Sequence, residues 1–69
     1  MGNIYVRGIA LPGSVRGAVV EIQDDFIVYI NTNLCEEVQR AAVAHELRHI
    51  EKDHFYNEQP VVYNELEAQ

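Results

Sequence analysis

The residues with the clearest chemical potential are His45, Glu46 and His49, which form a His-Glu-x-x-His sequence. Residues four apart lie on nearly the same face of a helix, so the two imidazoles can bind one zinc ion. Glu46 then flanks the metal as a general base, which takes a proton from the activated water and passes it to the leaving amine. This spacing predicts metal-assisted hydrolysis of a peptide bond, with Zn²⁺ as cofactor and a peptide or protein as substrate.

A catalytic zinc site of this class has a third protein ligand and keeps the fourth position open for water. His54 does not fit if the helix runs through it, because it would point about 140° away from His49. A carboxylate from the C-terminal segment is the better candidate, and both Glu65 and Glu67 qualify. A solvated acidic tail explains the same two residues without any metal, so the residues alone leave this choice open.

The pattern of the expected helix also bears on Glu46. At about 100° per residue, His45, Glu46 and His49 lie within or at the edge of the arc expected to face the core, which holds Cys35, Val38, Ala42, Val43, Leu47 and Ile50. An unpaired glutamate on a buried arc is costly, so Glu46 needs a partner or a function. The alternative is a structural one, with two satisfied core histidines and a buried salt bridge. Cys35 is expected to be a small core residue rather than a nucleophile.

The elements that must position these residues predict an α+β fold. A β-prone segment at 4–6 is followed by a hairpin, with strands at 18–23 and 26–31 and Asp24-Asp25 as its turn. A long helix is expected over about 34–54, with Asn33 and Glu36 as a capping box. Pro60 prevents the helix from continuing, and a short second helix is expected within 61–69.

Size and charge narrow the class of protein. The chain has 69 residues, 48% of them hydrophobic, which predicts one domain over 1–69 with a small core that a bound metal would help to stabilise. The formal charge is -6 and the five basic residues are scattered, so we expect no direct contact with nucleic acid. We expect no membrane segment, since the apolar runs are short. A single cysteine favours a reduced, cytoplasmic location. The sequence does not indicate the substrate or the oligomeric state.

A longer pattern surrounds the central motif. It consists of a hairpin ending in Ile30-Asn31, then residues 33–40 (NLCEEVQR), residues 44–50 (AHELRHI), and finally residues 65–68 (ELEA). Over residues 17–68 this combination resembles the ImmA/IrrE-type metallopeptidases, a branch of the gluzincins. In that family the third zinc ligand is a glutamate followed three residues later by alanine. The resemblance therefore implies Glu65, with Ala68 after it, rather than Glu67.

The resemblance also implies a small twisted sheet packed on the active-site helix, with an exposed strand able to hold an extended substrate. Related zinc peptidases stabilise the oxyanion with an aromatic hydroxyl or an imidazole, which makes Tyr56, Tyr63 and His54 candidates. The chain departs from the family at Arg48, where glycine is common, and in the apolar helix that normally continues after the Glu-x-x-Ala sequence. These departures indicate a minimal or partner-completed peptidase.

Two other functions are compatible with the sequence. One is a non-catalytic protein of the same fold, a regulator from a phage or mobile element, in which zinc is structural or absent. Its exposed strand would bind a partner such as a repressor or a toxin-antitoxin component. The other is a small α+β domain in which the His-Glu-x-x-His sequence is coincidental. An intact Glu46 favours catalysis, whereas the abrupt C-terminal end of the pattern favours binding.

Overall fold

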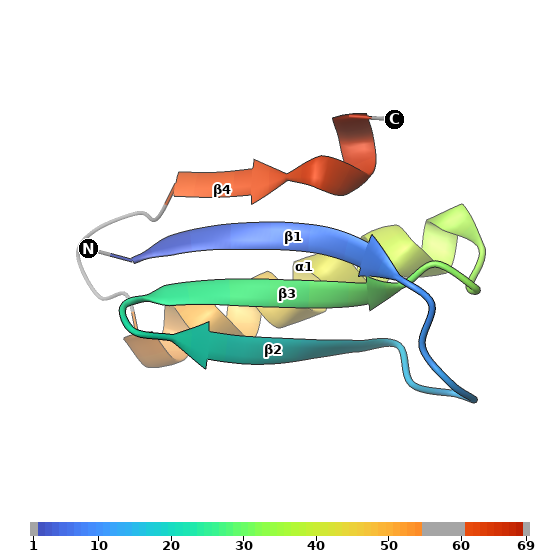
Figure 1. Ribbon diagram of the computed structural model, residues 1–69, viewed down its shortest axis with the longest axis horizontal. Helices are drawn as coiled ribbons and strands as arrows, with labels where there is room; N and C mark the ends of the chain where they lie inside the picture. The colour runs from blue at the N-terminus through green and yellow to red at the C-terminus, as the bar shows by residue number, and fades with distance from the viewer. Residues whose placement is uncertain (1, 55–60, 69) are drawn as a thin grey trace.

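The computed structural model describes residues 2–54 and 61–68 and has two layers, a mixed four-stranded sheet and one long helix (Figure 1). The elements in chain order are β1 (Asn3–Ile9), β2 (Gly17–Ile22), β3 (Asp25–Asn31), α1 (Glu36–His54), β4 (Val61–Asn64) and the 3-10 helix η1 (Glu65–Ala68). The α+β class, the hairpin, the N-terminal strand and the long helix are therefore confirmed. No helix in the described ranges combines the length and apolar composition that a bilayer span requires.

The sheet has the order β2-β3-β1-β4, and α1 covers one of its faces. Strand β3 is antiparallel to β2 and parallel to β1, and β4 is parallel to β1 at the far edge. Because side chains alternate along a strand, every second residue of the two central strands points towards α1. The core is built from these residues and the inner stripe of the helix: Ile4, Val6, Phe26, Val28, Ile30, Ala42, Val43 and Ile50.

The ends of two elements differ from the sequence prediction. The hairpin turns at residues 23 and 24 rather than at Asp24-Asp25, because Asp25 already pairs with Ile22. Its first turn residue, Gln23, has a positive φ of 55°, as two-residue hairpin turns require. The helix begins at Glu36, and Cys35 before it is exposed, so its predicted place in the core was wrong.

The predicted capping box at Asn33 does not form, because this residue is part of the turn that leaves β3. The Asn33 amide donates to Asn31 Oδ1 at 3.0 Å, and the Leu34 amide donates to the Asn31 carbonyl at 3.2 Å. The first helical bond runs instead from the Gln39 amide to the Cys35 carbonyl at 2.9 Å. Cys35 therefore takes the N-cap position.

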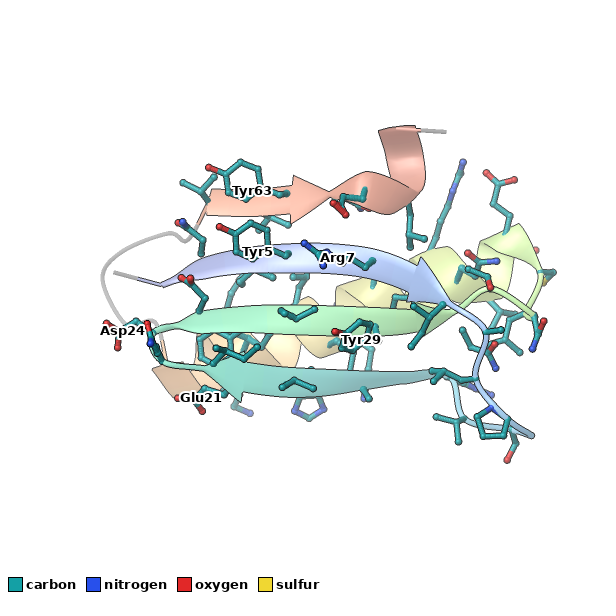
Figure 2. The ribbon with its side chains drawn as sticks, viewed as in Figure 1. Tyr5, Arg7, Glu21, Asp24, Tyr29 and Tyr63 are labelled. Carbon is teal, nitrogen blue, oxygen red and sulfur yellow. The ribbon has the colours of Figure 1, made fainter. Side chains whose placement is uncertain are left out.

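The predicted C-terminal helix over 61–69 is wrong, since residues 61–64 form β4 and only 65–68 are helical. Val61, Val62 and Tyr63 favour an extended conformation, and β1 offers them an edge to pair with. The rings of Tyr5 and Tyr63 stack with centroids 5.1 Å apart (Figure 2). Leu66 donates its amide to Asn64 Oδ1 at 3.0 Å, which starts η1 immediately after the strand.

Asn31 at the end of β3 is the one fully buried polar side chain of the described residues. Its Oδ1 accepts from the amides of Leu11, at 3.1 Å, and Asn33. Its Nδ2 donates to the Val15 carbonyl at 2.8 Å. Asn31 therefore holds the loop between β1 and β2 against the segment that connects β3 to α1. Its own amide donates to the Arg16 carbonyl at 2.9 Å, just before β2 begins at Gly17. Nothing in its local sequence distinguishes it from an ordinary turn residue.

Candidate functional site

A groove of about 430 Å³ lies between the edge strand β2 and α1, on the flank of the helix that carries the central motif. On the strand side it is lined by Arg16 and Gly17, and on the helix side by Ala41, Ala42, His45 and Glu46. Three of these residues have a methyl group or no side chain at all, so the groove stays open next to the motif. Sequence analysis did not include Arg16 or Gly17 in the site, because their position depends on how β2 folds over the helix.

The two histidines of the motif converge on the exposed side of this flank. Their Nε2 atoms are 3.1 Å apart, and the rings meet edge to face with centroids 4.6 Å apart. This distance suits a hydrogen bond between the two rings. Two nitrogens bound to one tetrahedral zinc would be about 3.3 Å apart, given bonds of about 2.05 Å. The pair therefore fits two positions of a zinc coordination sphere with little movement.

Glu46 lies between these histidines in the sequence but turns towards the sheet and is half-buried. A Cβ atom placed on Gly17 would be 3.9 Å from Glu46 Cγ and only 2.9 Å from the Tyr29 carbonyl oxygen. Glycine at position 17 thus allows the close approach to the Tyr29 carbonyl of β3, while Glu46 lies at ordinary van der Waals distance. Among the described residues, no side chain forms an ion pair with the Glu46 carboxylate. Its predicted position on the inner arc of the helix is confirmed, and it faces the groove.

Glu65, the predicted third ligand, lies elsewhere in the structure. Its Oε2 is 3.3 Å from Nε of Arg7. Arg7 follows the buried Val6 on β1 and therefore projects from the sheet face opposite α1, as Figure 2 shows. The structure does not bring Glu65 to His45 and His49, and within the described ranges no three His, Cys, Asp or Glu side chains form a metal-holding group.

The predicted oxyanion donors are not assembled with the motif either. Tyr63 stacks on Tyr5 on the same open sheet face as Arg7, across the sheet from the helix (Figure 2). Tyr56 lies outside the described residues. His54 ends α1 and Glu67 lies in η1, but their side chains are also outside the description. The structure therefore gathers His45, Glu46 and His49 and separates Glu65 and Tyr63 from them.

A second, larger groove of about 770 Å³ lies on the other flank of α1, next to β4 and η1. Its lining includes the ion pair between Arg40 and Glu36, with Nη2 and Oε1 2.7 Å apart. Asn64 and Leu66 close it on the sheet side. The lining contains no histidine or cysteine, and the motif side chains point to the opposite flank. The smaller groove is therefore the candidate functional site.

Comparison of the chain with protein-family models, curated proteins and solved structures finds no match. The geometry of His45, Glu46 and His49 is therefore the basis for inferring a function.

Proposed function

We propose that the protein is a small zinc-dependent peptidase whose site is the groove between β2 and α1. The observation that carries this proposal is the convergence of the His45 and His49 Nε2 atoms at 3.1 Å. The position of Glu46 in the adjoining groove supports it further, because a general base must lie beside the site where the water is activated. The resemblance to the ImmA/IrrE-type metallopeptidases points to the same activity.

In this proposal His45 and His49 hold the metal through Nε2. A bound zinc ion would lower the pKa of a water molecule and polarise the substrate carbonyl. With the metal bound, the Glu46 carboxylate would act as the general base, accepting a proton from the water and delivering it to the leaving amine nitrogen. Because β2 is an edge strand of the sheet, a substrate in extended conformation would be aligned by pairing with its free edge. Among the described strands, β2 pairs only with β3.

Two imidazoles alone bind zinc weakly, because a protein zinc site normally has at least three protein ligands. Glu65 remains the prediction from the family resemblance, but its carboxylate would have to leave Arg7 to reach the helix flank. We propose instead that water fills the remaining positions in the isolated chain and that a bound partner or substrate supplies a further ligand. Activity of the chain alone is then expected to be low.

Zinc titration tests the metal site directly. Wild-type protein should bind one equivalent of zinc in a calorimetric titration with excess metal, whereas His45→Ala and His49→Ala should lose this binding. Gln39→Ala, on the other flank of α1, is the matched control and should bind like wild type. Equal zinc binding by wild type and both histidine variants would contradict the proposal.

Glu46→Gln tests the catalytic role separately from metal binding. The amide keeps the shape of the side chain but cannot accept the proton, so zinc binding should persist while hydrolysis of a casein or peptide-library substrate falls about 10²–10⁴-fold. Hydrolysis at the wild-type rate in this variant would show that Glu46 is not the base.

A second function is favoured by the pairing of Glu65 with Arg7, which occupies the expected third ligand. In this alternative the protein has the same fold but binds a partner without cleaving it. It predicts that a bound protein or peptide is recovered intact from wild-type protein in the presence of zinc. Recovery of cleaved fragments would exclude it.

A further inference from the structure

The basic side chains of the protein divide into two groups. Arg7 and Arg40 form ion pairs with Glu65 and Glu36. Arg16, Arg48 and Lys52 have no ion-pair partner among the described residues, and all three are exposed. The unpaired cations are not scattered over the surface, because each of them lies beside the histidine pair.

Helical spacing places two of these cations next to the histidines. Arg48 follows His45 by three residues, and Lys52 follows His49 by three and Arg48 by four. Residues at these spacings are neighbours on one flank of a helix. Arg48 and Lys52 therefore continue the row of the two histidines towards the end of α1. Arg16 lines the groove from the strand side, opposite this row.

Acidic residues also lie in and near the groove. Glu46 is the one acid among the residues that line it. Glu21 is four residues beyond Gly17 on β2, about 13 Å away along the strand. Glu51 adjoins Lys52 in the sequence but points about 100° away around the helix. Arg16 and Glu46 offset each other in the lining, and Glu37 lies one helical turn before Ala41 on the same flank. The excess of positive charge beside the histidines therefore comes from Arg48 and Lys52, in a protein whose formal charge is -6.

We infer that the groove accepts an acidic peptide segment, with Asp or Glu side chains on both sides of the bond that lies at the histidine pair. Arg16 pairs with acids on one side of that bond, and Arg48 and Lys52 pair with acids on the other. This inference rests on the proposed peptidase function and specifies its substrate class. Nucleic acid is the less suitable anion, because it needs a broad cationic surface and the rest of this chain would repel it.

The test uses zinc-loaded Glu46→Gln protein and two fluorescent ten-residue peptides with the same apolar centre. One carries Glu on both sides of the centre, and the other carries Gln at the same positions. Fluorescence anisotropy at low salt should show the acidic peptide binding roughly 10-fold more tightly, from about three exposed ion pairs. This ratio should shrink in about 0.5 M salt, because screening weakens exposed pairs.

The same measurement in the presence of a chelator separates the two proposals. Loss of zinc should weaken the binding of both peptides but leave the ratio of their affinities unchanged. The acidic side chains are proposed to pair with Arg16, Arg48 and Lys52 and not with the metal. If the protein binds no zinc but keeps the ratio, the peptidase proposal fails and the charge selectivity stands. If the two peptides bind equally well both with and without zinc, the proposed charge selectivity is wrong, and the peptidase proposal is unaffected.

Charge reversal beside the groove tests directly whether Arg16 and Arg48 cause the preference for the acidic peptide. The double variant Arg16→Glu and Arg48→Glu should lose the preference for the acidic peptide and bind a lysine-substituted peptide better. The double variant Arg7→Glu and Arg40→Glu changes the net charge equally but lies away from the groove, and it should keep most of the preference. Equal loss in both double variants, or tighter binding of a single-stranded oligonucleotide than of the acidic peptide, would overturn the inference.

Discussion

The two flanks of α1 are built in different ways. The β2 flank carries the histidines and borders a strand that is joined to β3 by a two-residue turn. The β4 flank is bordered by a strand whose partner, β1, lies at the other end of the sequence. The motif residues come together within about one turn of one helix, whereas the long-range pairing of β4 with β1 positions Glu65. This difference explains why the motif residues are gathered and the predicted third ligand is not.

The largest effect is expected at Asn31, which holds the β2 flank in place. Asn31→Ala would remove the partners of two amides and one carbonyl at a fully buried position. We expect a loss of about 2–4 kcal/mol in the free energy of unfolding, measured by urea denaturation. Asn33→Ala removes one exposed hydrogen bond and is the control, with an expected loss under about 1 kcal/mol. Similar losses in both variants would contradict the special role of Asn31.

A smaller effect is expected at Gly8, which sets the packing of the β4 flank. A Cβ atom there would be 2.6 Å from both Leu66 Cδ2 and Thr32 Cγ2, so these two side chains must move. We expect Gly8→Ala to cost about 1–3 kcal/mol in the free energy of unfolding. Zinc binding at the other flank should not change. In the double variant with Leu66→Ala the two losses should be less than additive, because removal of the leucine relieves the clash. Full additivity would show that Leu66 does not lie over Gly8.

The pair between Arg7 and Glu65 should contribute still less to stability. Both side chains are about half exposed, at 49% and 53%, so Glu65→Gln should change the free energy of unfolding by no more than about 1 kcal/mol. Because the structure holds Glu65 away from the histidines, zinc affinity should also stay within about threefold of wild type. A loss of zinc binding as large as that in His49→Ala would instead show that Glu65 moves to the metal and that the family pattern applies.

The smallest effect is expected in the hairpin turn. Gln23 has a φ of 55°, a conformation that glycine adopts more readily than a residue with a side chain. Gln23→Gly should therefore raise the free energy of unfolding by roughly 0.5 kcal/mol, seen as a small rise in Tm. Asp24→Gly, the neighbouring turn position without a positive φ, should not stabilise the protein. A decrease in Tm for Gln23→Gly would argue against the turn geometry.

Sequence reasoning succeeded where the signal is local. The almost continuous apolar run from Phe26 to Ile30 predicts β3, and the spacing around Glu46 predicts a helix with that residue turned inward. It failed at β4, because Glu65, Leu66 and Ala68 favour a helix while the preceding valines and tyrosine pair with a strand more than fifty residues away. It also could not identify Asn31 or Arg16 as important, since their roles depend on a loop that folds back on the sheet.

The central place of β1 in the sheet has a kinetic consequence. This strand is made first, yet both of its neighbours, β3 and β4, come later in the chain and pair with it in parallel. Parallel pairing between distant segments raises the contact order and slows folding relative to a hairpin. The antiparallel pair β2 and β3 is therefore expected to form early as a template for β1, and the Tyr5 and Tyr63 stack should be acquired last.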